Sequence, residues 1–128
     1  MSRLTGVHPR LIFAVTKILN ASAELGCPMM VTSGVRTTEQ QQALYAKGRT
    51  EPGRIVTQAD GVRKKSKHQA QYDGFGHAVD LTFMVDGRPS WAEDHPWDLY
   101  GEMAKVLGLE WGGSWDGFVD RPHVELKP

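Results

Sequence analysis

The stretch His-Ala-Val-Asp-Leu-Thr-Phe-Met-Val at residues 77–85 alternates in the manner of a β-strand, and Asp86-Gly87 directly after it is a strong hairpin signal. Successive side chains of a strand point to opposite faces of the sheet. One face is expected to contact the core through Val79, Leu81 and Phe83. The other face carries Gly76, Ala78, Asp80 and Thr82. Because an acid stands among small residues there, we expect another group to dock closely against Asp80.

The other periodic segments add helices and short strands around this strand. Apolar residues recur at helical spacing before Gly26, a capping box begins at Thr37, and Pro96 is favoured in a first helical turn. These signals predict helices at residues 11–25, 37–47 and 96–107. Further strands are expected at residues 28–32, 110–111 and 122–126. Helices gathered around a small, mostly antiparallel sheet define an α+β domain.

Length and charge limit what the chain can be. With 128 residues we expect a single domain over residues 1–128. Fifteen basic and fifteen acidic side chains cancel, which argues against a nucleic-acid partner and against stable membrane association. No stretch approaches the roughly 20 apolar residues of a membrane-spanning helix, and the N-terminal residues do not resemble a secretory signal. We expect a monomer.

A single cysteine, Cys27, excludes a cysteine-rich metal cluster, so a catalytic metal would need His, Asp or Glu ligands. The candidates are His68 in a loop, Asp80 on the alternating strand and His123 on the last strand. His77 falls on the opposite face from Asp80, so the two cannot share a metal in a regular strand. Two histidines and one carboxylate form a ligand set of catalytic zinc sites that leaves a position open for water. Taken alone, His123 would be interpreted as a structural histidine, and a lone loop histidine such as His68 is usually exposed to solvent.

Residues 49–75 show little periodicity and several glycines. A loop of this length in a small domain is uncommon and usually functional. It carries the basic run Arg63-Lys64-Lys65. Because the net charge is zero, we interpret this run as a solvated part of the loop rather than as a nucleic-acid contact.

Several segments follow one another in an order known from one family. They are Ser-Gly-Val-Arg at 33–36, Ser-Lys-His at 66–68, Gly-His-Ala-Val-Asp-Leu at 76–81, Trp-Gly-Gly-Ser-Trp at 111–115 and Asp-Arg-Pro-His-Val-Glu-Leu at 120–126. Together they resemble the zinc D-alanyl-D-alanine peptidase superfamily, most closely its L-alanyl-D-glutamate endopeptidase branch, which is found among phage endolysins. The resemblance spans nearly the whole chain. It implies the α+β fold shared by hedgehog and D,D-peptidase domains, as one zinc peptidase domain without a separate cell-wall-binding domain.

The resemblance also implies roles for individual residues. His68, Asp80 and His123 are expected to bind Zn²⁺. Asp120, three residues before the last ligand, matches the family's general base or acid. Arg36 matches an arginine that stabilises the developing oxyanion, a role that suits its fixed positive fork.

Some assignments stay open at this stage. The family commonly has a shorter run before the aspartate ligand, and at that usual spacing Asp73 would take the place of His68. Glu125 shares a strand face with His123, and we expect it to orient a ligand or contact substrate rather than act as the base. Tyr72 and Phe75 either shape the mouth of the site or hold the loop in place. Trp111 and Trp115 are candidates for a substrate wall, although core packing explains Trp111 equally well.

The expected activity is hydrolysis of peptidoglycan stem peptides at the L-alanyl-D-glutamate bond. The alternatives are a D,D-carboxypeptidase or dipeptidase that releases D-alanine, and a zinc-containing binding module without catalysis. An endolysin of this type would stay in the host or bacterial cytoplasm until it is released, and would then act on the cell wall as an antimicrobial lysin.

Overall fold

The computed structural model describes residues 3–128, and the predicted α+β fold is confirmed. The helices are α1 (Pro9–Glu24), α2 (Thr38–Ala46) and α3 (Trp97–Val106), with a short 3-10 turn at Gly112–Ser114. The strands are β1 (Met29–Ser33), β2 (Ala78–Val85), β3 (Arg88–Ser90), β4 (Leu109–Trp111) and β5 (His123–Leu126). All named pairings are antiparallel, in the order β1-β2-β5-β4 with β3 also on β2. The long strand predicted from the alternating stretch is therefore the centre of the sheet.

Strand β2 turns back on itself where the sequence indicated a hairpin. Asp86 and Gly87 have φ values of 53° and 76°, and two successive left-handed residues are what a type I′ turn requires. The return strand β3 was not predicted, because three residues are too few to show an alternation.

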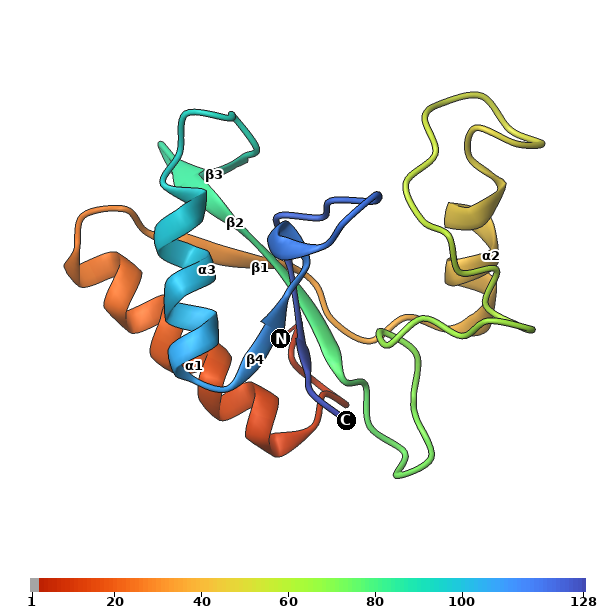
Figure 1. Cartoon of the computed structure of the whole chain (residues 1–128), viewed down its shortest axis with the longest axis horizontal. Helices are drawn as coiled ribbons and strands as arrows, with labels where there is room; N and C mark the ends of the chain where they lie inside the picture. The colour runs from red at the N-terminus through yellow and green to blue at the C-terminus, as the bar shows by residue number, and fades with distance from the viewer. Residues whose placement is uncertain (1–2) are drawn as a thin grey trace.

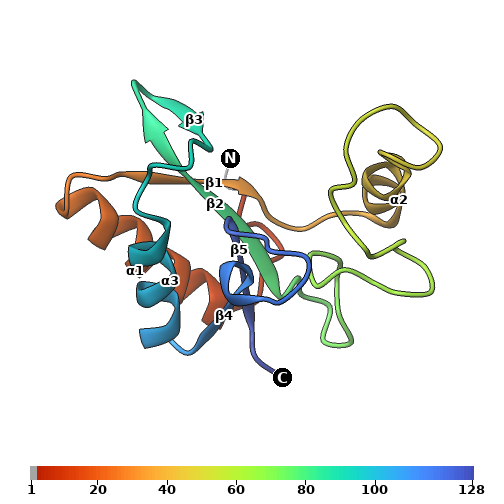
Figure 2. The ribbon, with the colours of Figure 1, turned by 45° about the horizontal axis from the view of Figure 1, so that its top comes forward.

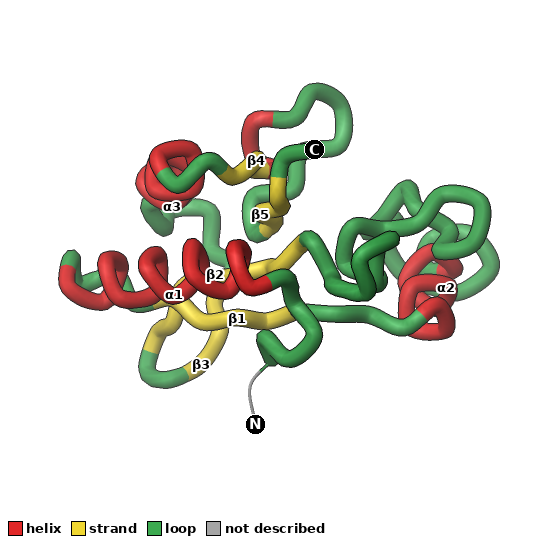
Figure 3. The backbone as a smooth tube through the Cα atoms, turned by 90° about the horizontal axis from the view of Figure 1, so that it is seen from below, coloured by secondary structure: helices red, strands yellow, loops and turns green. Residues whose placement is uncertain are grey.

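The molecule has two parts: a body formed by α1, α3 and the sheet, and a separate part formed by α2 and the loop after it (Figure 1). Helices α1 and α3 lie side by side along the sheet, as Figure 3 also shows, while α2 and the loop after it stand apart at the other end of β1. The core is formed by apolar side chains of α1, α3 and the strands, among them Leu11, Ile18, Leu81, Phe83, Tyr100 and Val124. No described helix is long and apolar enough to cross a membrane.

Helix α2 joins the body through polar contacts. Its only buried side chain is that of Gln41. The Gln41 amide donates to the Ala59 carbonyl at 2.9 Å and its oxygen accepts from Arg36 at 3.1 Å. The predicted capping box is present, with Thr37 and Gln40 bonded to each other's backbone. This helix and residues 49–75, which form no helix or ladder of their own, lie together on one side of the molecule, away from α1 and α3 (Figure 2).

Trp111 belongs to the core rather than to a substrate wall. Its side chain is buried, its Nε1 donates to the Arg121 carbonyl, and its ring lies over Gly101 of α3. A Cβ at Gly101 would come within 2.3 Å of the ring. The glycine in the middle of this helix is therefore explained by the close approach of Trp111.

This contact gives a prediction for Gly101→Ala. Alanine normally stabilises a helix interior by about 1 kcal/mol over glycine. Here we expect a loss of about 1–3 kcal/mol in the free energy of unfolding, because the added methyl group overpacks the core. Urea unfolding followed by tryptophan fluorescence measures this. Lys105→Ala, at an exposed site of the same helix, should change stability by less than about 0.5 kcal/mol, and a stabilised Gly101→Ala variant would contradict the packing account.

Candidate metal centre and cleft

Strand register brings two of the predicted ligands together. Asp80 lies directly opposite His123 across the β2–β5 pair, and on its other side it faces Ser33 of β1. His68 reaches this pair of residues from the loop between α2 and β2. Oδ1 of Asp80 lies 3.2 Å from Nε2 of His68 and 3.3 Å from Nδ1 of His123. One ligand atom from each residue lies within 4.8 Å of the others, so the three side chains form a group that could hold a metal ion.

Each histidine is oriented through the ring nitrogen that faces away from the centre. Nδ1 of His68 lies 2.9 Å from the Gly34 carbonyl, and Nε2 of His123 lies 2.7 Å from Oε1 of Glu125. Because a carbonyl or carboxylate oxygen can only accept, these two nitrogens carry the protons. In neutral rings the other nitrogens then present lone pairs to the centre, which is the usual arrangement of histidine metal ligands.

Two buried atoms at the centre have no hydrogen-bond partner among the described residues: Nε2 of His68 and Oδ1 of Asp80. They lie at contact distance, but their alignment does not make a hydrogen bond. Buried polar atoms are rarely left without a partner unless an ion or water serves them. The donor set and these two atoms therefore fit a metal ion.

Local structure explains how a loop residue reaches this position. The Ser66 hydroxyl accepts from the backbone N–H of His68 at 3.1 Å, and the His68 carbonyl accepts from Arg36 N–H at 2.9 Å. The predicted close docking against the small face of β2 is also present. A Cβ at Gly76 would lie 2.8 Å from Val35 and 3.2 Å from the His68 carbonyl.

Arg36 is bonded to a predicted ligand. Its Nη2 donates to Oδ2 of Asp80 at 3.1 Å, its Nη1 to Gln41 and its Nε to Ser33. These bonds use three of the five N–H groups of the guanidinium. By holding Oδ2, Arg36 leaves Oδ1 of Asp80 directed at the two histidines. The sequence did not indicate Gln41 and Ser33 as partners, because their positions depend on how α2 folds against β1.

The charges of the group are strongly coupled. Burial opposes ionisation of Asp80, but the neighbouring His68 and His123 outweigh it and hold the pKa of Asp80 well below its ordinary value. Burial lowers the pKa of His123, but contacts with the carboxylates of Asp80 and Glu125 raise it, to about 9. The metal-free site therefore holds a proton on His123 at neutral pH.

That proton must leave when a metal binds, which gives a pH dependence. Below pH 9 each bound ion displaces one proton from His123, so metal affinity should rise with pH. Between pH 7 and pH 8 we expect the apparent Kd for zinc to fall about tenfold. Titration calorimetry in two buffers of different ionisation enthalpy measures the released protons, and the absence of proton release would contradict the assignment of His123.

Asp120 lies at the edge of the group. Its Oδ2 is 3.8 Å from Nδ1 of His123, and its side chain is about one third exposed, at 31%. Burial and the charge of Asp80 raise the pKa of Asp120 above its ordinary value. A partly exposed carboxyl with a raised pKa, beside candidate metal ligands, is suited to exchanging protons with a substrate.

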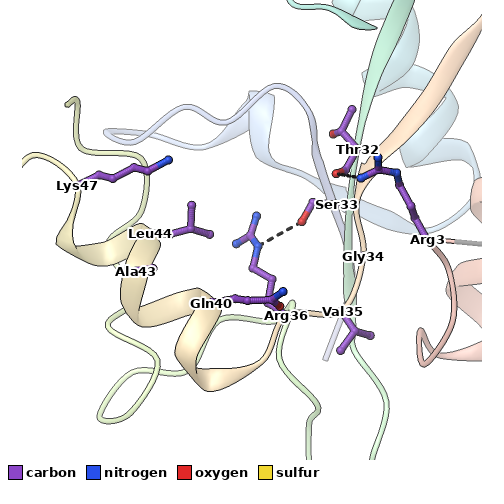
Figure 4. A pocket seen from close by; sticks show the side chains of 10 residues that line it. All are labelled: Arg3, Thr32, Ser33, Gly34, Val35, Arg36, Gln40, Ala43, Leu44 and Lys47. Atoms are coloured by element: carbon purple, nitrogen blue, oxygen red, sulfur yellow. Dashed lines mark hydrogen bonds between the residues drawn. The ribbon is translucent and has the colours of Figure 1, made fainter. Parts of the chain in front are cut away.

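The group lies in a cleft of about 680 Å³. One wall is the 56–68 loop, which contributes Lys64, Lys65 and Lys67; the facing wall contributes Trp115, Asp116 and Phe118. The Trp115 ring lies 5.0 Å from that of His123, so of the two tryptophan candidates this one lines the site. Arg36 also borders a second hollow of about 500 Å³ between β1 and α2, in which Figure 4 shows its bond to Ser33.

The other sequence candidates lie outside this cleft. Asp73 bonds Nε2 of His77 at 2.8 Å and approaches His8, so the structure brings His68, and not Asp73, to the group. Phe75 packs on His8, which leaves it the role of holding the loop, whereas the side chain of Tyr72 is 97% exposed.

Glu125 bonds the His123 ring nitrogen that faces away from the group, so its influence on metal affinity can be measured. Removing its charge with Glu125→Gln should weaken zinc affinity about 10–100-fold, as expected for a partner that orients a ligand. Competition with a chromophoric chelator measures the change. The matched control is Glu110→Gln, because Glu110 lies directly opposite on β4 but bonds Trp115 rather than His123. Equal losses in both variants would show a general charge effect instead.

Comparison with known proteins places the chain in a family. The family model described as D-alanyl-D-alanine carboxypeptidase matches residues 60–126. The peptidoglycan L-alanyl-D-glutamate endopeptidase CwlK of Bacillus subtilis (strain 168) is 34% identical over 131 residues, which cover 95% of this chain and 74% of that protein. The L-alanyl-D-glutamate peptidase of Listeria phage A118 is 29% identical over 116 residues, covering 89% of this chain but only 36% of the phage protein.

Solved structures support the same family relationship. The L-Ala D-Glu endopeptidase ChiX of Serratia marcescens has a TM-score of 0.65 and 27% identity, covering 98% of this chain and 84% of that one. A vancomycin-resistance D,D-pentapeptidase VanY in complex with Zn(II) has a TM-score of 0.61 at 19% identity, covering 94% and 72%, and so shares the fold. This chain belongs to the D-alanyl-D-alanine carboxypeptidase family of peptidases, and the predicted resemblance to its L-alanyl-D-glutamate endopeptidase branch is confirmed.

Proposed function

We propose that this chain hydrolyses the amide bond between L-alanine and D-glutamate in the peptide stems of peptidoglycan, with Zn²⁺ held by His68, Asp80 and His123. The observation that carries the proposal is the His68–Asp80–His123 group on the floor of a cleft, in a chain 34% identical to an endopeptidase of this specificity. Zinc bound there would act as a Lewis acid on the scissile carbonyl and would acidify an attacking water.

Asp120 supplies the proton transfers in this proposal. It takes a proton from the water whose oxygen attacks the carbonyl carbon of the alanine. It then gives that proton to the glutamate nitrogen as the C–N bond breaks. The second proton of the water passes from the new carboxyl group to the released amine, which leaves an alanine carboxylate and an ammonium group. The raised pKa of Asp120 supports both of its steps, because a more basic carboxylate accepts the proton more readily and remains an acid strong enough to return it.

Arg36 is proposed to stabilise the oxygen that becomes negative during attack. It lines the cleft with its planar, permanently charged guanidinium, and its bonds to Asp80, Gln41 and Ser33 fix its orientation before substrate arrives. A donor fixed in advance stabilises developing charge without having to reorganise.

Digestion of purified cell wall tests the cleaved bond. New amino termini should be D-glutamate and new carboxyl termini L-alanine, identified by mass spectrometry after labelling. Release of free D-alanine alone would instead support a D,D-carboxypeptidase, the activity in the description of the matching family model. The control is protein treated with a chelator and then restored with zinc.

An enzyme differs from a zinc-containing binding module in that it needs the chemistry of two further residues, Asp120 and Arg36. Such a module needs the ligand group but has no use for a base or an oxyanion partner. In this chain Asp120 and Arg36 both line the cleft beside the group. Their presence supports an enzyme, while storage in the cytoplasm before release and an antimicrobial effect stay predictions from the sequence.

A further inference from the structure

The basic run between residues 63 and 67 is not simply a solvated loop. Lys64, Lys65 and Lys67 all line the same cleft as the candidate metal group, whereas Arg63 does not. Among residues 3–128, no carboxylate lies within ion-pair distance of these three ammonium groups. They therefore present positive charge to whatever occupies the cleft.

The backbone that carries the lysines is held in a defined turn. Oδ1 of Asp60 accepts from three successive backbone N–H groups, those of Val62, Arg63 and Lys64, at 2.9, 2.9 and 3.0 Å. Gly61 N–H donates to the Lys64 carbonyl, which closes the turn.

The same turn is tied to the residue beside His68. The buried Gln69 amide donates to the Gly61 carbonyl at 3.0 Å, and its oxygen accepts from the Ser66 N–H at 2.9 Å. The segment that carries Lys64, Lys65 and Lys67, here called the lysine wall, is thus fixed relative to His68. The reason is that Gln69, the residue after His68, bonds both Gly61 before the lysines and Ser66 among them. Flexible side chains on a fixed backbone lose less freedom on binding than the same side chains on a mobile loop.

The charges of the cleft are segregated. The 56–68 wall contributes lysines and no acid, whereas the acids of the cleft are Asp80 on the floor and Asp116, Asp120 and Glu125 on the facing side. Arg36, the other cation of the cleft, is bonded to Asp80. A substrate lying between the walls would therefore meet positive charge without an acidic partner only on the side of the loop. Its anionic groups are therefore expected to turn toward the loop.

We infer that Lys64, Lys65 and Lys67 form a subsite for the free carboxylate of the glutamate residue on the leaving side of the scissile bond. The inference rests on the proposed function. A glutamate joined to its neighbours through its amino group and one carboxyl keeps its second carboxyl free. The subsite makes the enzyme select stems that carry this group as a carboxylate over stems in which it is a carboxamide.

Two synthetic tripeptides test this. Both are L-alanyl-D-glutamyl-L-lysine, and they differ only in whether the free carboxyl of the glutamate is a carboxylate or a carboxamide. The zinc-loaded protein should cleave the carboxylate peptide with a kcat/KM about tenfold or more above that for the carboxamide, because hydrogen bonds to charged groups are lost in the amide. Each Lys→Gln variant should reduce the preference, and the triple variant should remove it.

Arg63→Gln is the matched control, because it removes the same charge from the same turn outside the cleft, and it should keep the full preference. Equal cleavage of both peptides by the unaltered protein would overturn the subsite and leave the proposed function standing. So would a triple variant that keeps the preference, or an Arg63→Gln variant that loses it. Cleavage of neither peptide would overturn the proposed function itself, and the subsite with it.

Discussion

Replacing Asp80 with asparagine should remove zinc and abolish turnover, the largest effect expected from a single substitution in this chain. Among residues 3–128, Asp80 alone lies within ion-pair distance of both candidate histidine ligands and of Arg36. Asparagine keeps the size of the side chain but not its charge. We expect zinc affinity to fall by at least about 100-fold, since losing a ligand exceeds the effect of losing a partner that orients one.

The matched control is Asp73→Asn. Asp73 also lies between two histidines, with His77 at 2.8 Å and His8 at 3.9 Å, but it is outside the cleft. This variant should keep zinc and full activity. Metal content by inductively coupled plasma mass spectrometry and release of new amino termini from cell wall give the two readings. Zinc retained in Asp80→Asn and lost in Asp73→Asn would place the metal at the other cluster.

Asp120→Asn should separate catalysis from metal binding. We expect zinc to stay bound while kcat falls about 10²–10⁴-fold, which is the range for losing a general acid or base. The variant should keep zinc because Asp120 lies 3.8 Å from His123 and outside the group of three. The measurement is kcat on a soluble stem peptide with metal content determined on the same sample.

Asp94→Asn is the control for that substitution, since Asp94 is an exposed acid before α3 and away from the cleft. It should leave kcat and zinc unchanged. Unaltered turnover in Asp120→Asn would transfer the role of base to Glu125, which already holds Nε2 of His123. Loss of zinc together with turnover would instead make Asp120 part of the metal site.

Strand patterns made the positions of two of the three candidate ligands, Asp80 and His123, predictable. Alternation in residues 77–85 separated Asp80 from the core and from His77, and the structure has both separations. His123 followed from the same alternation in the last strand. What alternation cannot give is the register between strands, and it is the pairing of Asp80 with His123 that brings the two together.

Local sequence patterns do not predict where the side chains of loop residues lie. The position of His68 depends on the Ser66 hydroxyl and on the Gly34 carbonyl, which lies 34 residues earlier in the chain. The family's usual spacing points to Asp73, and only Ser66, two residues before His68 as in the family's Ser-x-His run, favours His68. Lys64, Lys65 and Lys67 are exposed, as expected of a solvated loop, but charge counts do not show that they face the cleft. The direction of the loop is set by the Asp60 turn and by Gln69, and neither forms a periodic signal.

Zinc content of three purified proteins tests the central claim, that His68 completes a metal site with Asp80 and His123. The proteins are the unaltered chain, His68→Ala and His77→Ala, each dialysed with zinc and freed of excess metal. We expect one zinc per chain in the unaltered protein and in His77→Ala, and less than about a tenth of that in His68→Ala. Zinc kept in His68→Ala and lost in His77→Ala, or no zinc in the unaltered protein, would contradict the claim.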